Sequence, residues 1–276
     1  MSVITAWTFT RWEAKNEPAR GQERRPGPPR SSVEQPSGEL QLRSGDGHHP
    51  DPWLLARRLL VGRDHTRART GRPAALTLPG LESKDADRSG IGLRDHVDAV
   101  ITAVDQAEGP VVLVGHSGGG AIAHAVADAR PNRVARVVYV DSGPLGDGGV
   151  INDELPVVNG EIPLTDWSAF PPEEMRDLDQ GLRVAFEDRA IPQPAGVATD
   201  RQVLTDERRY DVPATVIACA FSSDQLKEWI AQGQPFVAEL AAIKDVEYID
   251  LPTGHWPQFT KPAELGKAIL AAVDRG

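Results

Sequence analysis

The chain has 276 residues and a formal net charge of −10, with 40% hydrophobic and 25% charged residues, which is ordinary for a globular protein. The negative charge excludes a general nucleic-acid or membrane-surface binder, the single cysteine, Cys219, excludes a disulfide framework, and no apolar run is long enough for a membrane span. Because the N-terminus also lacks a secretory apolar region, we expect a cytoplasmic protein, and its oligomeric state stays open.

The first quarter of the chain differs from the rest in composition. Residues 1–75 carry 13 Lys+Arg against 8 Asp+Glu, a net +5, whereas the remaining residues carry a net −15. All but one of those 13 basic residues are arginine, and residues 20–39 are rich in Pro, Arg and Glu, a composition typical of disorder. We therefore treat residues 1–71 as an atypical segment, irregular or disordered, and residues 72–276 as the folded domain.

Strands and helices alternate from residue 73 onward, which predicts a doubly wound, mostly parallel α/β sheet. In chain order we expect a strand at 73–81, a helix at 92–107, a strand at 111–115, a helix at 119–130, a strand at 136–140, a strand at 214–221, helices near 223–232 and 235–243, a strand at 246–251 and a helix at 262–273. Residues 142–211 interrupt this alternation, so we interpret them as an inserted cap.

A glycine-rich turn, GHSGGG, joins the apolar strand at 111–115 to the next helix. A phosphate-binding P-loop would need a lysine that is absent here. A dinucleotide site is the stronger alternative: Gly118, Gly120 and Ala123 fit G-x-G-x-x-A, and Asp141 ends the next strand, where a ribose-binding carboxylate would lie. An NAD(P)-type oxidoreductase therefore stays open as a second function.

The same turn also fits the G-x-S-x-G pattern of a nucleophilic serine. The pattern places Ser117 on a sharp strand-to-helix turn, where its oxygen is exposed above the sheet. The N–H of Gly118, at the start of the helix, can then face a developing oxyanion. A serine hydroxyl needs a base, and His255 in the loop after the last strand is the candidate.

Residues 73–276 resemble the α/β-hydrolase superfamily, close to its small esterase and hydroxynitrile-lyase-like members. The motifs GHSGGG and TGHWPQFTKP carry this resemblance. It implies a serine hydrolase that cleaves a small ester or related acyl compound through a Ser-His-Asp triad, with neither metal nor organic cofactor. A catalytically impaired binding protein with the same fold remains an alternative.

The acid of the triad has two candidates. Asp224 follows the strand at 214–221, which is the commoner place for the acid in this family. Asp141 stands directly at the end of the strand at 136–140, where some lipases of the family keep their acid. His116 and Trp256, the neighbours of the serine and of the histidine, are candidate oxyanion or substrate-binding residues.

Several other residues have ordinary interpretations. His48 and His49 suggest a metal site, but no second cluster with ligand spacing accompanies them. His96 and His124 fall on predicted helices and are expected to be structural. Two aromatic residues in the cap, Trp167 and Phe170, fit either a substrate pocket or the cap's own small core.

The resemblance leads us to expect a strand ending in Pro-Gly before residue 73, and the loop after that strand would give the second oxyanion donor. The sequence before residue 73 contains no such strand. Translation one nucleotide later permits Met-Ala-Ile-Ile-Pro-Ile-Pro-Gly over residues 46–53, followed by Trp-Trp-Asp; only the glycine is forced, by Trp53 before a leucine codon. We hypothesise that residues 1–71 are a frameshifted translation joined to a hydrolase sequence. The chain as written is then expected to be a poor enzyme with an irregular N-terminal segment and an uncovered sheet edge.

Overall fold

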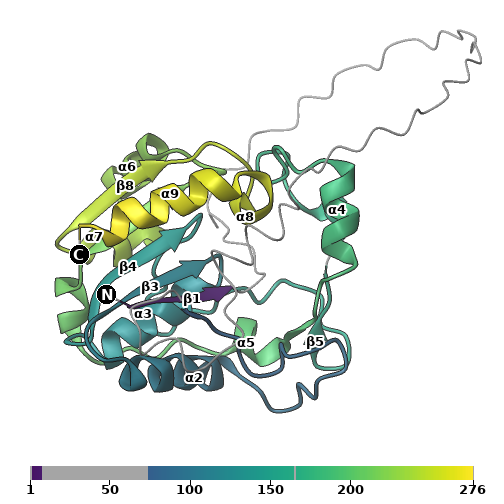
Figure 1. Cartoon of the computed structure of the whole chain (residues 1–276), viewed down its shortest axis with the longest axis horizontal. Helices are drawn as coiled ribbons and strands as arrows, with labels where there is room; N and C mark the ends of the chain where they lie inside the picture. Colours follow the sequence, from purple (N-terminus) through teal and green to yellow (C-terminus); the bar gives the residue numbers. More distant parts are fainter. Residues whose placement is uncertain (1, 8–73, 165, 276) are drawn as a thin grey trace, which may run out of the picture.

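The computed structural model describes residues 2–7, 74–164 and 166–275. Its main sheet has six strands in the order β2-β1-β3-β4-β7-β8, and every neighbouring pair is parallel. The bounds are Ser2–Trp7 for β1, Ala74–Ala75 for β2, Val111–His116 for β3, Val134–Val140 for β4, Ala214–Ala218 for β7 and Val246–Asp250 for β8. The doubly wound α/β fold predicted from the alternation is therefore confirmed (Figure 1).

Helices cover both faces of this sheet. The side chains of Val111 and Leu113 on β3 join a core with α2 (Leu93–Gln106), α3 (Gly119–Ala129) and α6 (Ser223–Ala231). Val112 and Val114 point to the opposite face and pack with α9 (Pro262–Val273). Because successive strand residues alternate between faces, a wholly apolar β3 is what burial on both sides requires.

Strand β1 lies where the sequence led us to expect an uncovered edge. Ile4 is paired with Ala74 of β2 and with Leu113 of β3, so β1 is an interior strand. The prediction of an irregular N-terminal segment is therefore wrong for Ser2–Trp7, because an extended backbone of six residues supplies the pairing that β3 needs. The other expectations for the segment, including His48, His49 and the shifted strand at 46–53, lie outside the described residues.

The strand expected at 73–81 is shorter than its pattern suggests. It ends at Ala75, and a turn closed by Leu81 N–H to the Leu78 carbonyl (3.0 Å) follows. Gly80 in this turn has a φ of +79°, a conformation that L side chains rarely adopt. The Pro79-Gly80 pair lies in this turn, after the strand has ended, and turns the chain toward α2.

The predicted cap contains short elements, and several of them lie beyond the carboxyl ends of β3 and β4 (Figure 1). They are β5 (Glu161–Ile162), η2 (Trp167–Ala169), α4 (Gln180–Glu187), β6 (Gln193–Pro194), α5 (Ala195–Thr199) and η3 (Glu207–Asp211). The segments after β7 and β8 add η4 (Pro235–Val237), α7 (Ala238–Ala242) and α8 (Pro257–Thr260). A separate apolar cluster around Leu178, Phe186 and Trp256 gives the α4 region its own core.

Candidate active site

The turn at Ser117 has the strained backbone of a nucleophile elbow. Ser117 has a φ of +53°, which is uncommon for a residue other than glycine. Gly115 leaves room for the turn, since a Cβ at that position would lie 2.4 Å from the Gly119 carbonyl oxygen. The Ser142 hydroxyl donates to the Ser117 carbonyl at 2.5 Å. Strain of this kind persists where surrounding contacts fix it.

His255 approaches the serine from the loop after β8. Its Nε2 lies 3.0 Å from Ser117 Oγ, and its Nδ1 lies 2.7 Å from Asp141 Oδ2. An ionised carboxylate only accepts hydrogen bonds, so Nδ1 carries the ring proton in this contact. Nε2 can then accept the hydroxyl proton of Ser117, which is the geometry that a general base requires. All three side chains are buried.

Asp141 is fixed by the end of a neighbouring strand. Its Oδ1 accepts backbone N–H bonds from Cys219 (2.9 Å) and Ala220 (2.8 Å), which follow β7. Asp141 itself has a φ of +42°, and its N–H donates to the Ile217 carbonyl at 2.8 Å. Both carboxylate oxygens are therefore engaged, and one of them is directed at the histidine.

Asp224, the other candidate acid, lies elsewhere. Its side chain is 93% exposed and pairs with Lys227 at 3.3 Å on the surface of α6. Of the two candidates, the structure brings Asp141 to His255 and leaves Asp224 in solvent. Asp141 lies at a strand end whose backbone is fixed by β7, whereas Asp224 lies in the first turn of α6 with its side chain in solvent.

The loop that carries His255 is fixed from two sides. His116 Nε2 lies 2.6 Å from the His255 carbonyl oxygen, and burial, with a smaller effect of nearby His255, lowers the pKa of His116 well below its usual value. His116 is thus a neutral donor to the base loop and is absent from the lining of the cavity beside Ser117. From the cap, the Glu174 carbonyl accepts the His255 N–H (2.8 Å).

Trp256 belongs to the aromatic cluster of the cap. Its ring makes edge contacts with Trp167 (5.5 Å), Phe170 (5.1 Å) and His255 (5.2 Å) between centroids. It is 3% exposed and does not line the cavity beside Ser117. Of the two interpretations of Trp167 and Phe170, the structure supports the cap core, and this core packs against His255 through Trp256.

The residue predicted to give one oxyanion donor, Gly118, lies at the start of α3. Gly118 is the N-cap residue of α3, so its N–H is at the positive end of the helix dipole. The second donor in such folds comes from a loop after an earlier strand. Here β1 ends at Trp7 beside His116, and the residues that follow it lie outside the described part of the chain.

Two further buried histidines make their contacts outside the arrangement of Ser117, His255 and Asp141. His96 Nε2 contacts the Pro79 carbonyl (2.9 Å), and His124 contacts Tyr139 and Glu239. Burial, and to a lesser degree Asp141, raises the pKa of the Cys219 thiol, which keeps it protonated. Within residues 74–164 and 166–275 with β1, no group of three or more His, Cys, Asp or Glu side chains could hold a metal ion. Among those residues no helix is both long and apolar enough to cross a membrane.

Comparison with known proteins places this arrangement in a family. The sequence profile described as the Alpha/beta hydrolase family matches residues 44–268. The chain belongs to this family. The match begins inside the segment that composition set apart, so residues 44–71 are also part of the region matched to the α/β hydrolases.

Known α/β hydrolases resemble the chain in sequence and in fold. It is 42% identical over 205 residues to Lipase LipV of Mycobacterium tuberculosis (strain ATCC 25618 / H37Rv), covering 64% of this chain and 76% of that protein. The crystal structure of a pyrethroid hydrolase from Sphingobium faniae JZ-2 matches with a TM-score of 0.53 at 20% identity, covering 81% of this chain and 92% of that one. An extracellular α/β-hydrolase from a Paenibacillus species matches with a TM-score of 0.56 at 18% identity, covering 80% and 93%. At these identities the two structures support the fold alone.

Proposed function

We propose that this α/β hydrolase is a serine esterase in which Ser117, His255 and Asp141 act as the catalytic triad. The observation that carries the proposal is the continuous contact from Ser117 Oγ through the imidazole to Asp141, at 3.0 and 2.7 Å. An unassisted hydroxyl is a weak nucleophile, and an adjacent imidazole held by a carboxylate activates it by accepting its proton. The similarity to a lipase supports ester bonds as the target.

The reaction follows from these positions. Ser117 Oγ forms a bond to the ester carbonyl carbon, the carbonyl π pair moves onto oxygen, and the hydroxyl proton passes to Nε2 of His255. The Gly118 N–H faces the resulting oxyanion. Collapse of this intermediate breaks the bond to the alcohol, which leaves with the proton from Nε2. A water molecule then attacks the acyl-enzyme by the same route, releasing the acid and restoring Ser117.

Asp141 stabilises the imidazolium that forms in each half-reaction and does not itself take the proton. Its two backbone N–H bonds fix the carboxylate, so little reorganisation is needed when charge develops on the ring. The dinucleotide alternative is less well supported, because Asp141 is engaged by His255. Packing also explains the glycine at position 120 without a nucleotide, because a Cβ there would lie 2.3 Å from Ser142 Oγ.

The test is hydrolysis of p-nitrophenyl acetate by the full chain and by Ser117→Ala. We expect the turnover number to fall by about a million-fold, the loss measured when a triad serine is removed from a well-studied protease. Ser89→Ala is the matched control, since Ser89 is exposed and bonds to Asp87 in its own turn. Equal hydrolysis by the wild type and Ser117→Ala would remove Ser117 from the mechanism. A cyanohydrin in the same assay tests for lyase chemistry.

A further inference from the structure

A cavity of about 400 Å³ opens beside the serine. Its walls come from the Ser117 turn, from residues 142–152 after β4 and from residues 235–239. Much of the lining is apolar, with contributions from Leu145, Ile151 and Phe236. The volume is within the range of small-ligand sites, so one side of an ester bound at Ser117 would fill it.

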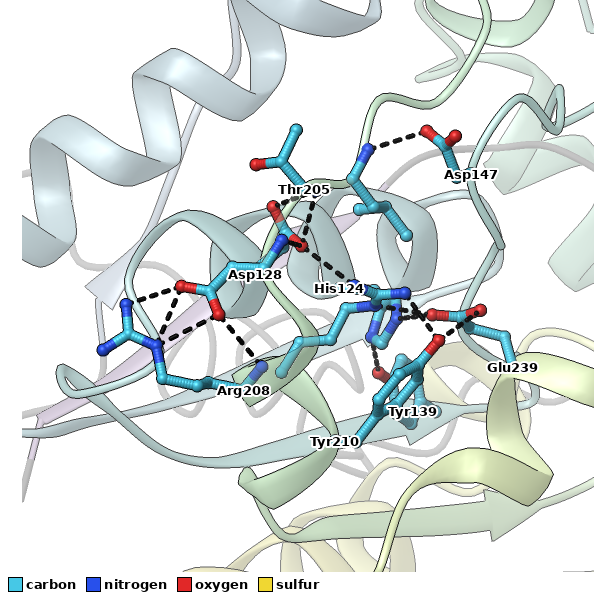
Figure 2. Close-up of polar contacts among 11 residues, drawn as sticks. His124, Asp128, Tyr139, Asp147, Thr205, Arg208, Tyr210 and Glu239 are labelled. Atoms are coloured by element: carbon cyan, nitrogen blue, oxygen red, sulfur yellow. Dashed lines mark hydrogen bonds and ion pairs between the residues drawn. The ribbon is translucent and has the colours of Figure 1, made fainter.

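One wall of this apolar cavity holds a carboxylate, that of Glu239. Its Oε1 accepts from His124 Nε2 (2.9 Å) and from Arg209 Nε (2.7 Å). Arg209 also contacts Asp128 (3.3 Å), and His124 Nδ1 lies 3.0 Å from the Tyr139 hydroxyl. Figure 2 shows this network, which joins α3 and β4 to the segment after α6.

Glu239 is ionised despite its burial. Burial alone would raise the pKa of Glu239, but the hydrogen bonds and charges of His124 and Arg209 outweigh that effect and lower it to about 2. The side chain is 13% exposed, and a charge in such a place must be compensated by neighbouring groups. The network therefore holds a fixed negative charge at the cavity wall.

The second oxygen, Oε2, is directed toward the cavity. Among the described residues, its hydrogen-bond partner is the Tyr210 hydroxyl at 3.3 Å, so it retains capacity for a further donor. An added Cβ at Gly146, which lines the cavity, would lie 3.4 Å from Oε2. The lining includes a second carboxylate, Asp147, and contains no lysine or arginine from the described part of the chain.

We infer that the part of the ester seated in this cavity ends in a hydrogen-bond donor, a hydroxyl or an ammonium group, that binds Glu239 Oε2. The inference rests on the proposed function, because it assumes that Ser117 attacks the ester. A methyl group at the same place would exclude water from Oε2 and offer it no donor beyond the long contact with Tyr210, which is costly for a charged oxygen. A carboxylate-ended substrate would add like-charge repulsion between the two groups.

The experiment compares isosteric esters that end in methyl, hydroxyl or carboxylate, over a short range of chain lengths. One series varies the acyl group of p-nitrophenyl esters, and a second varies the alcohol of acetate esters, so that either side of the ester is sampled. In one series we expect the wild type to prefer hydroxyl over methyl by about tenfold to a hundredfold in kcat/KM, the value of a hydrogen bond to a charged group. The carboxylate-ended ester should be the slowest.

Glu239→Gln tests the origin of that preference. The amide preserves the shape and an oxygen for His124 and Arg209 but removes the charge, so the hydroxyl-to-methyl ratio should fall toward one and the carboxylate-ended ester should gain. Each ratio is taken within one enzyme preparation and is independent of how much of the variant folds. Glu228→Gln is the matched control, since Glu228 is exposed on α6 and bonds to Gln232.

Three results would overturn the inference. The first is that neither series shows a preference for hydroxyl over methyl. The second is a preference that Glu239→Gln leaves unchanged. Either result would exclude Glu239 as the selecting group, and the proposed function would still stand if hydrolysis depends on Ser117. The third result is an absence of hydrolysis for every ester, which would overturn both proposals together.

Discussion

The turn at Ser117 and strand β1 are neighbours in the same sheet, yet they depend on sequence in opposite ways. Trp7 at the end of β1 is paired with His116, the residue before the serine. The turn requires particular residues, because Ser117 has a φ of +53° and Gly115 has no room for a Cβ. The place beside β3 requires a backbone that can extend and pair, with no particular residue at any one position. A catalytic turn is therefore specified residue by residue, whereas a strand position in a parallel sheet admits different sequences.

Substitution of the two candidate acids, Asp141 and Asp224, gives the largest expected difference in turnover. Asp141→Asn should lower turnover of p-nitrophenyl acetate by about 10⁴-fold, the loss seen when the triad acid of a well-studied protease becomes an amide. The amide cannot stabilise the imidazolium, and it disturbs the orientation of His255. Asp224→Asn, at a 93% exposed side chain, is the matched control and should change turnover little. Equal small losses from both variants would mean that Asp141 is not the triad acid.

A change in the reading frame before residue 73 tests whether the place that β1 occupies beside β3 admits a different strand. We expect a chain whose residues 46–71 are translated one nucleotide later to hydrolyse esters about 10²- to 10³-fold faster, the value of one oxyanion donor. The strand ending in Pro-Gly would replace β1 beside β3 and raise the melting temperature. The check is to compare melting and p-nitrophenyl acetate hydrolysis of both chains. If the chain as written matches the altered one in both, residues 1–71 are a genuine segment.

Strand β1 can be tested by removing one backbone donor. Thr5 is paired with Ala75 and with Val114, and proline has no N–H to give to the sheet. Thr5→Pro should lower the free energy of unfolding by about 1–3 kcal/mol, the cost of leaving a buried partner unsatisfied, as measured by urea denaturation. Thr5→Ala keeps the N–H and is the control. If the two variants are equally stable, β1 does not pair with β3 in solution.

Much of the fold and the core of the site could be predicted from local patterns. The period of apolar residues predicted α2, β3 and α9 within a few residues, and G-x-S-x-G predicted the turn. The choice between Asp141 and Asp224 could not be made, because it depends on the N–H groups of Cys219 and Ala220, which approach Asp141 from a different strand.

Two further features also depend on contacts between distant segments. The Glu239 network combines residues from α3, β4, η3 and α7, and none of them belongs to a recognisable motif. The pairing of β1 depends on β3 having an edge that no other strand covers, and no pattern within Ser2–Trp7 predicts this. Sequence patterns thus predict elements and turns, and the tertiary contacts decide which polar groups meet.

The central claim, that Ser117 is activated by His255, is tested most directly by locating the adduct of a fluorophosphonate probe. The wild-type chain, treated with the probe and digested, should carry the phosphonyl group on the peptide that contains Ser117. His255→Ala should greatly slow that labelling because the hydroxyl loses its base. An adduct on another residue, or labelling of Ser117 at the same rate in His255→Ala, would contradict the account.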